Sequence, residues 1–418
     1  MAEAHERELV ELEIGPVAHG GHCVARHEGR VVFVRHTLPG ERVRAVLTDA
    51  EPDATFWRAD AVEVLDASPD RVPSVWPQAG PGGVGGGELA HVALPAQRAW
   101  KAAVLREQLQ RLGKVERDVT VHAAAGDDER GGLAWRTRID LVADEHGRAG
   151  MRRHRSHDVV AIDEMPLAVE QIAELELFGR RWPVGARIEA IAPVGGDRPL
   201  VLVDGVPYDL GRRRPDTRPN ARTSVREVVV ADDVERTYRV AAAGFWQVHR
   251  QAPATLVHAV LGGVGDVAGA TVLDLYAGAG LFTAALADAV GPTGRVVSVE
   301  GDARAVRDAR RNLHDRTNVE LHAGDVARVL TGEQDASSDV VHADVVVLDP
   351  PRVGAGRRVL DAVTALRPER LVYVACDPAA LGRDVALLAD AGYGLLDVDG
   401  YDLFPMTHHV EAVATFAR

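Results

Sequence analysis

The chain has 418 residues, of which 46% are hydrophobic and 26% charged, so it is long enough for two or three domains and has the composition of a globular protein with a substantial core. Its formal net charge of −14 at pH 7 argues against binding to a polyanion that is driven by the overall charge of the protein. Two cysteines cannot form a disulfide framework, and no stretch approaches a membrane span or an apolar signal core, so we expect a cytoplasmic protein, by default a monomer.

Residues 1–66 have the pattern of a small β-barrel. Short apolar runs separated by turn signals lie at 8–14, 21–26, 30–34, 41–49 and 57–65. This count and spacing are typical of a five-stranded barrel of the oligonucleotide-binding type. Cys23 lies in the second run without any catalytic neighbourhood, so we expect it to be a small core residue.

Residues 67–240 predict a central α+β domain that recognises the substrate. A glycine-rich stretch at 80–87 is followed by a helical pattern at 97–112, which could also pack on the catalytic domain, and then by short strands and turns at 134–240. Basic residues gather at two places, Arg152, Arg153, His154, Arg155 and His157, and Arg212, Arg213 and Arg214. Arginine suits planar phosphate and base contacts. The alternative is that both clusters are solvated faces.

Residues 241–418 predict a Rossmann-like α/β catalytic domain. The apolar run 271–276 leads through Gly278 and Gly280 into a helical pattern at 281–290. A strand, a glycine turn and a helix in this order bring the backbone close to a bound ligand without a Cβ clash.

The ligand of this turn is predicted to lack a phosphate. Thr283 stands where a dinucleotide-binding turn has its third glycine, so pyrophosphate binding loses support. S-adenosylmethionine fits better, because it offers an adenosine and an amino acid. Four apolar stretches in succession lead to an acidic residue, namely Asp274, Glu300, Asp325 and Asp349. At the sheet edge Glu300 could accept hydrogen bonds from two ribose hydroxyls, and Asp325 could accept one from the adenine amino group.

Cys376 is placed as a nucleophile would be. The apolar strand 371–375 runs directly into it, and Asp377 and Pro378 follow. A side chain at the carboxyl end of a strand in an open α/β sheet points into the ligand crevice. The alternative is a buried, inert thiol.

Taken together, these features resemble the RNA 5-methyluridine methyltransferases, which methylate carbon 5 of uracil in ribosomal or transfer RNA. The resemblance covers nearly the whole chain. It rests on Phe245–Trp246–Gln247, on 273–280, on Asp-Pro-Pro-Arg at 349–352 with Gly354, on 372–378 and on the tail 402–411. The amino-terminal barrel looks like a TRAM domain, an RNA-binding module of the ribosomal RNA members.

The resemblance implies a class I methyltransferase fold, S-adenosylmethionine as the donor and RNA as the partner. It assigns Cys376 as the nucleophile that adds to uracil carbon 6, which makes carbon 5 able to attack a methyl group. It assigns Glu411 as the base that removes the proton from carbon 5. The alternative for Glu411 is an ordinary surface ion pair.

The remaining site residues follow from the same resemblance. The implied donor-binding residues are Gln247, Tyr276, Gly278, Gly280, Glu300, Asp325 and Asp349. Arg352 is expected to contact phosphate or the thiol. Because a stacked uracil must be flipped out, an aromatic residue is expected to line the gap. Phe404, Trp246 and Tyr276 are candidates, and at least one of them is expected to be core.

The chain departs from the family in two ways. Many members hold an iron-sulfur cluster on four cysteines, but the corresponding segment here is Pro81–Val84 and the fourth position falls near Met165, so we expect no cluster and no metal. The nucleophile motif has Asp377 where the family usually has asparagine. A carboxylate beside the thiol should raise the pKa of Cys376.

Two other functions stay open. An amino-methylating nucleic-acid methyltransferase also uses an Asp-Pro-Pro segment, like that at 349–351, but needs no thiol. A catalytically impaired RNA-binding protein would explain the missing cluster and Asp377. If the chain is a uracil methyltransferase, the TRAM-like barrel favours 23S ribosomal RNA over transfer RNA, whereas no residue specifies the target uridine.

Overall fold

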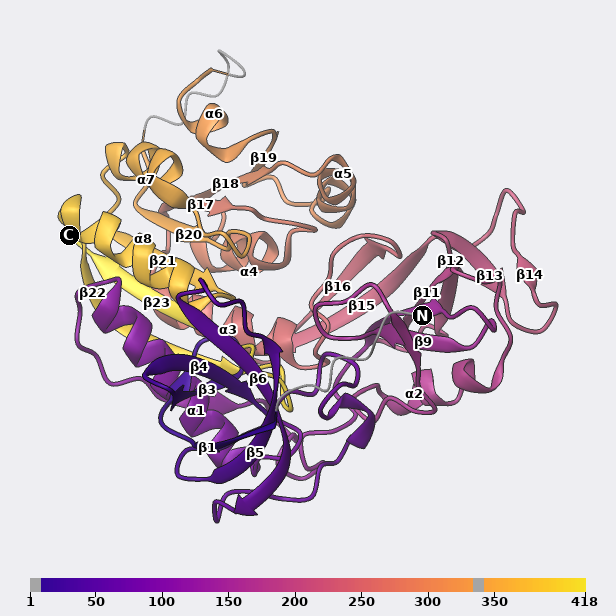
Figure 1. Ribbon diagram of the computed structural model, residues 1–418. Coiled ribbons are helices and arrows are strands. Elements are labelled where there is room, and N and C mark those ends of the chain that lie inside the picture. Colours follow the sequence, from indigo (N-terminus) through magenta and orange to yellow (C-terminus); the bar gives the residue numbers. More distant parts are fainter. Residues whose placement is uncertain (1–8, 334–341) are drawn as a thin grey trace.

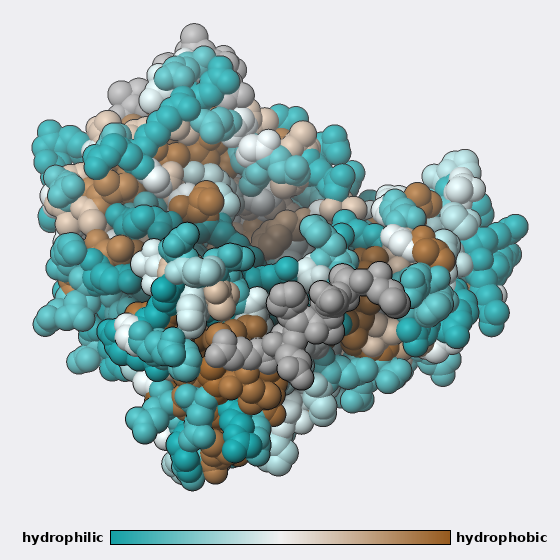
Figure 2. Space-filling model, in the orientation of Figure 1, coloured by the Kyte–Doolittle hydropathy of each residue, from teal (hydrophilic) through white to brown (hydrophobic). Residues whose placement is uncertain are grey.

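The computed structural model describes residues 9–333 and 342–418, and three parts can be followed in Figure 1. These are an amino-terminal barrel, a central antiparallel sheet and a carboxyl-terminal α/β part. A long hairpin of β15 (Ser224–Ala231) and β16 (Val234–Ala241) leads from the central sheet to the α/β part. Figure 2 shows this face of the molecule hollowed between those two parts, with hydrophobic residues inside the hollow. None of the described helices is both long and apolar enough to cross a membrane.

The barrel has six strands, in the order β1-β5-β6-β4-β3-β2. They are β1 (Leu9–Glu13), β2 (Val17–Ala18), β3 (His22–His27), β4 (Arg30–Arg35), β5 (Arg42–Asp49) and β6 (Phe56–Asp66). Burial alternates along β1 and β5, so every second side chain enters the core. The five predicted strands are present, although residue 8 of the first lies outside the described residues. The prediction of five strands missed β2, and Cys23 is fully buried as expected.

The central sheet has seven antiparallel strands in the order β10-β9-β8-β11-β12-β13-β14. They are β8 (Arg138–Ala143), β9 (Ala149–Arg152), β10 (Val159–Ala161), β11 (Arg187–Ile191), β12 (Leu200–Val203), β13 (Val206–Asp209) and β14 (Arg214–Pro215). Two short helices, α2 (Glu170–Ala173) and η2 (Leu177–Gly179), cover the core, in which Trp135 and Trp182 are buried. The predicted α+β character of this region therefore agrees with the structure.

By the resemblance described above, a cluster cysteine is expected at the position of Val84 and another near Met165. Val84 is 1% exposed and Met165 7% exposed, and both belong to the core cluster that contains Trp76. The preceding short helix, η1 (Pro77–Ala79), folds this segment onto the central sheet. Apolar packing thus supports the segment. Among the described residues, no group of three or more His, Cys, Asp or Glu side chains is arranged to hold a metal ion.

The carboxyl-terminal part contains an eight-stranded sheet in the order β19-β18-β17-β20-β21-β23-β22-β7. They are β7 (Val121–Ala123), β17 (Thr271–Leu275), β18 (Arg295–Glu300), β19 (Val319–Ala323), β20 (Val345–Leu348), β21 (Arg370–Ala375), β22 (Gly394–Asp402) and β23 (Glu411–Ala417). The five strands from β19 to β21 are parallel, and β23 is antiparallel to both of its neighbours. The strand order reverses beside β17, so a crevice is expected at the carboxyl ends of β17 and β20.

Helices cover both faces of this sheet. The helices after the central part are α3 (Ala252–Val264), α4 (Leu281–Val290), α5 (Ala303–Asn312), α6 (Val326–Leu330), α7 (Gly356–Ala365) and α8 (Pro378–Asp390). Residues of α3 and α4 share one hydrophobic cluster, and those of α6, α7 and α8 share another. The sheet is therefore buried on both sides, which explains its nearly continuous apolar strands.

The stretch 67–240 also contributes one helix and one strand to the carboxyl-terminal α/β part, which contains the eight-stranded sheet. Helix α1 (Leu94–Arg111) packs on α8 and β22, and β7 adds an edge strand beside β22. The helix begins three residues before the predicted start, where Pro95 fits the first turn. The packing of this helix agrees with the expectation that it could pack on the carboxyl-terminal α/β domain. The division at residues 66 and 240 stays a prediction.

Candidate active site

The glycine turn after β17 takes three left-handed backbone conformations within five residues. Tyr276 has φ +66°, Gly278 +58° and Gly280 +91°. A Cβ on Gly280 would lie 2.9 Å from Leu313 Cδ1, whereas a Cβ on Gly278 would meet nothing within 4 Å. The turn therefore has open space at Gly278. The left-handed conformation of Tyr276 is costly for a bulky residue, which points to a functional constraint.

Glu300 holds this turn in place. Its Oε2 accepts a hydrogen bond from Gly278 N at 2.7 Å, and its Oε1 accepts one from Asp302 N at 2.6 Å. Each carboxylate oxygen keeps a second acceptor position. Asp274 lies beneath the turn, completely buried, with Oδ2 accepting from Thr283 Oγ1 at 2.5 Å and with no partner for Oδ1. Burial raises the pKa of Asp274 to about 7.

Of the other predicted donor-binding residues, Asp325 lies near this turn, where burial and then the charge of Asp325 raise the pKa of Tyr276. Asp325 is exposed and caps α6, where its Oδ1 accepts from Arg328 N at 3.0 Å. Gln247 is half-buried beside Trp246. Trp246 is 5% exposed and lies 5.2 Å from Tyr238, ring centre to ring centre, so it is the core member of the three aromatic candidates.

Cys376 and Glu411 lie at the same end of the sheet, because Ala375 of β21 pairs with Ala412 of β23. Asp349 and Arg352 follow the neighbouring strand β20. The pKa of the Cys376 thiol is raised to about 12, first by burial, then by Glu411 and Asp349, while Arg352 opposes the rise. Burial and Asp349 raise the pKa of Glu411 well above its usual range, again opposed by Arg352. Burial, Asp274 and Glu300 raise the pKa of Asp349 to about 7. The alternative considered for Glu411, an ordinary surface ion pair, does not fit, because the residue is only 6% exposed.

Asp377 contributes least to the raised pKa of the Cys376 thiol, although it is the neighbour in sequence. It caps α8, with Oδ1 accepting from Ala380 N at 2.7 Å, while Oδ2 lies 3.2 Å from Nε2 of His19 in the barrel. Burial favours a higher pKa for Asp377, but the hydrogen bonds from His19 and Ala380 N outweigh it and lower the pKa. The effect of Asp377 on the pKa of the thiol has the predicted direction, and it is smaller than the effects of burial, Glu411 and Asp349.

Helix α1 fixes the loop between β22 and β23, which carries Phe404 and leads to Glu411. Lys101, completely buried, donates to Asp402 Oδ1 at 2.5 Å and to Phe404 O at 3.0 Å. Gln97 Oε1 accepts from Met406 N at 2.8 Å. The sequence analysis missed Lys101 and Gln97. They could have been recognised in the sequence as two polar residues, four positions apart, on the face of the helix that also carries the buried apolar residues.

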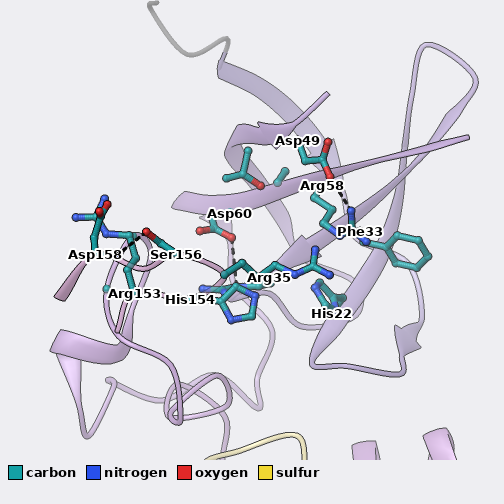
Figure 3. A pocket seen from close by; sticks show the side chains of 15 residues that line it. His22, Phe33, Arg35, Asp49, Arg58, Asp60, Arg153, His154, Ser156 and Asp158 are labelled. Atoms are coloured by element: carbon teal, nitrogen blue, oxygen red, sulfur yellow. Dashed lines mark hydrogen bonds and ion pairs between the residues drawn. The ribbon is translucent and has the colours of Figure 1, made fainter. Parts of the chain in front are cut away.

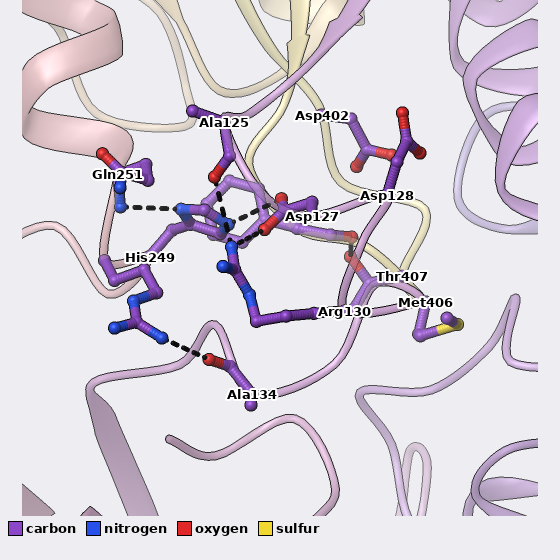
Figure 4. A network of polar contacts seen from close by, with 12 residues as sticks. Ala125, Asp127, Asp128, Arg130, Ala134, His249, Gln251, Asp402, Met406 and Thr407 are labelled. Carbon is purple, nitrogen blue, oxygen red and sulfur yellow. Dashed lines mark hydrogen bonds and ion pairs between the residues drawn. The ribbon is translucent and has the colours of Figure 1, made fainter. Parts of the chain in front are cut away.

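A second buried network holds the segment that follows Gln247 (Figure 4). His249 Nδ1 accepts from Gln251 N at 3.0 Å, so a neutral ring donates from Nε2 to Asp127 Oδ2 at 2.9 Å. Asp127 Oδ1 accepts from Arg130 at 2.7 Å, and Trp135 stacks on the histidine ring. These contacts join segments about 120 residues apart, and the sequence did not reveal them.

Phe404 lies where these two networks meet. It is half-buried, in edge-to-face contact with Trp135 at 6.0 Å and with His409 at 5.8 Å between ring centres. Arg352 is exposed. The predicted substrate role of both residues stays a prediction.

One of the two predicted basic clusters faces the barrel across a cavity of about 400 Å³ (Figure 3). Arg153 and Arg155 come from the central part, and Arg35 and Arg58 come from the barrel. Arg35 Nε lies 3.3 Å from Asp60 Oδ1, and Arg58 Nη1 lies 2.6 Å from Asp49 Oδ2. The other cluster, Arg212–Arg214, is exposed and lines neither this cavity nor the one described below.

Comparisons with known proteins agree with this architecture. Residues 211–418 match the family model described as tRNA (Uracil-5-)-methyltransferase, and residues 3–62 match the TRAM domain model. The chain is 46% identical to an uncharacterized RNA methyltransferase of Streptomyces coelicolor, over 97% of this chain and 92% of that protein. It is 42% identical to another of Bifidobacterium longum, over 98% and 96% of the two chains.

A solved structure confirms the fold prediction. The tRNA (uracil-54, C5)-methyltransferase of Pyrococcus abyssi, crystallised in complex with S-adenosyl-L-homocysteine, superposes with a TM-score of 0.69. The superposition covers 97% of this chain and all of that chain, at 22% sequence identity. The predicted α/β fold and TRAM-type barrel are therefore both confirmed.

Proposed function

Since the chain belongs to the tRNA (uracil-5-)-methyltransferase family of RNA methyltransferases, we propose that it transfers a methyl group from S-adenosylmethionine to carbon 5 of a uridine in RNA. The observation that carries this proposal is that Cys376 and Glu411 adjoin the paired residues Ala375 and Ala412 of neighbouring strands, beside the strand that leads to Asp349. A thiol and a carboxylate at one site supply the nucleophile and the base that this chemistry requires.

The residues of the glycine turn fit the donor. The open space at Gly278 leaves room for a ligand, and Glu300 and Asp325 keep carboxylate acceptors for ribose and adenine groups. Gln247, Tyr276, Gly280 and Asp349 complete the proposed set. Bound there, S-adenosylmethionine supplies a methyl group activated by a positively charged sulfur.

The proposed reaction uses two protein groups in sequence. The Cys376 thiolate forms a bond to uracil carbon 6, and the displaced electron pair makes carbon 5 nucleophilic, so that carbon 5 takes the methyl group. Glu411 then removes the proton from carbon 5, and the electrons of that C–H bond re-form the ring double bond as the thiolate leaves. Burial of Glu411 makes its carboxylate a stronger base, because it favours the protonated form.

The RNA is proposed to lie across the barrel and the central part, with ribosomal RNA favoured over transfer RNA because of the TRAM domain. The basic cavity between Arg35 and Arg155 supports this direction of approach, since it adjoins the barrel turn that contacts His408. Phe404 and Arg352 would contact the flipped uracil or its phosphate.

The test is to incubate the protein with labelled donor and separate fractions of ribosomal and transfer RNA, and to identify the modified nucleotide by mass spectrometry. We expect 5-methyluridine, in the ribosomal fraction. Label in transfer RNA would correct the substrate, and a different methylated nucleotide would overturn the proposed chemistry.

Two other functions are distinguished by separate measurements. The Asp-Pro-Pro segment at 349–351 would also suit an amino-methylating enzyme, which would stay active after Cys376→Ser. The raised pKa of the thiol would suit a protein that binds RNA without catalysis. In that case the protein would bind the donor and RNA but transfer no methyl group to either RNA fraction.

A further inference from the structure

A second cavity, of about 340 Å³, lies between the central part and helix α5. Four arginines line it, Arg304, Arg307 and Arg311 from α5 and Arg239 from β16, and all four are exposed. The three on α5 are spaced i, i+3 and i+7, so they lie along one face of the helix. Neither the family resemblance nor the proposed active site uses any of them.

The positive charge of this cavity is less compensated than that of the cavity in Figure 3. There, four arginines share the lining with Asp49, Asp60 and Asp158, and two of the arginines are in ion pairs. Here Asp308 is the single acidic residue among the described residues that line the cavity. It is already engaged, with Oδ2 accepting from Ala241 N at 2.7 Å and Oδ1 lying 3.6 Å from Arg311.

Both walls of the cavity are continuous in sequence with segments of the proposed donor site. Helix α5 begins three residues after Glu300, and Ala241–Ala243 are separated from the Phe245–Gln247 segment only by Gly244. Arg304 Nη1 donates to Ala243 O at 2.5 Å, which ties the two walls together. Phe245, next along this segment, is 75% exposed and is the kind of aromatic surface on which a base can stack.

We propose that the cavity formed by Arg239, Arg304, Arg307 and Arg311 binds a backbone phosphate of the RNA strand outside the reaction crevice. Guanidinium groups match the geometry of phosphate oxygens. Exposed arginines arranged along one helix face suit a long polyanion, which gains from several weak contacts. This phosphate site rests on the proposed function, because it assumes that the substrate is RNA. It would give this acidic protein a local basic surface on which to bind that RNA.

The test compares two charge-matched double variants by filter binding to total ribosomal RNA and total transfer RNA, without donor, across a salt series. The cavity variant is Arg307→Gln/Arg311→Gln, which leaves the Arg304–Ala243 contact intact. The control is Arg310→Gln/Arg106→Gln, in which one exposed arginine lies on the same helix outside the cavity and the other on α1. The cavity variant should bind RNA about fivefold more weakly, and its slope of log K against log salt should be shallower by about 1.5.

The control variant should keep the wild-type slope, and both should keep the wild-type melting temperature and donor affinity. Equal slopes for the two double variants would overturn the proposal, as would inorganic phosphate binding at the cavity with an unchanged RNA slope. If the cavity variant does not fold, Arg307→Gln alone serves, with half the change in slope. Because binding is measured without turnover, a product other than 5-methyluridine would refute the proposed chemistry and leave this result standing.

Discussion

Cys376 and Glu411 share one electrostatic environment, and it opposes the charged form of both. Glu411 is buried and Cys376 is half-buried, and partial or complete loss of solvent together with the charge of Asp349 raises both pKa values. Arg352 is the cationic side chain that opposes this rise at both residues. In the proposed reaction the thiol must lose its proton and the carboxyl group must be ionised. In the free protein near neutral pH, both groups are therefore held toward their protonated forms, which cannot carry out the proposed reaction.

The first prediction is that methyl transfer speeds up with rising pH. Below a thiol pKa of about 12 the thiolate fraction grows about tenfold per pH unit, and the ionised fraction of Glu411 also grows as pH rises through its raised pKa. Hence kcat/KM for RNA should increase from about pH 6 to about pH 9. Initial rates with labelled donor measure this. A profile that is flat or falls over that range would contradict the raised pKa values.

The pH profile of the Asp377→Asn variant tests how much Asp377 contributes to the raised pKa of the Cys376 thiol. Asp377 is the smallest of the influences on the thiol, and its carboxylate is already bound by His19 and by Ala380 N. The substitution should therefore move the profile to lower pH only slightly. A large acceleration at neutral pH would show that Asp377, rather than burial, holds the thiol protonated.

The second prediction concerns Glu411→Gln. Without a base at this position the proton on carbon 5 should stay in place, so the bond between Cys376 and the RNA should persist after methyl transfer. A slow-migrating protein–RNA species on a denaturing gel, carrying the donor's label, is the expected result. A variant that turns over normally would remove Glu411 from the proposed mechanism.

At the scale of elements, α1 and the loop from β22 to β23 form one unit around the buried Lys101–Asp402 pair. Lys101 is completely buried and Asp402 has 2% of its side chain exposed. Burial lowers the pKa of Lys101, and Asp402 opposes that change. Because Lys101 also donates to Phe404 O, the pair orients the loop that ends at Glu411.

The third prediction follows from that burial. Lys101→Met should lower the free energy of unfolding by about 3–5 kcal/mol, because it leaves the charge of Asp402 buried without a partner. The double variant Lys101→Met/Asp402→Asn should recover part of the loss. Urea denaturation of the three proteins measures both effects. Equal stability of the single variant and the wild type would mean that the pair is not buried in solution.

The sequence predicts those elements whose signals are local. The barrel strands were placed to within about one residue because apolar residues alternate along them. The positions of Cys376, Glu300 and Asp349 at the carboxyl ends of parallel strands were predicted because each stands at the end of an apolar run. Strands β2 and β7 are two and three residues long, too short for any periodicity. Lys101 and the His249–Asp127 pair depend on partners about 300 and 120 residues away, which no local pattern reveals.

At the scale of the whole molecule, the barrel lies against the proposed active site. His19 contacts Asp377, and a Cβ on Gly21 would lie 3.1 Å from the Cβ of His408 in the loop before Glu411. The barrel thus touches both segments that carry the proposed reacting groups. RNA held by the barrel would lie close to the thiol.

The fourth prediction uses two glycines with the same backbone conformation. Gly21 and Gly29 both have φ +78°, but a Cβ on Gly29 would meet nothing within 4 Å. Each change to alanine should cost about 1–2 kcal/mol of backbone strain. Only Gly21→Ala should also raise the KM for RNA, because it displaces the barrel from His408. Melting temperatures and steady-state kinetics separate the two effects, and equal KM values would argue against a functional contact.

The most direct test of the proposed mechanism is to trap the bond between Cys376 and its substrate. RNA in which uridine is replaced by 5-fluorouridine has no proton for Glu411 to remove, so the intermediate should accumulate as a heat-stable conjugate that carries one methyl group, with its peptide link at Cys376. Cys376→Ser should form none. If the intact protein methylates ordinary RNA at carbon 5 yet forms no conjugate with the fluorinated RNA, the covalent mechanism is contradicted.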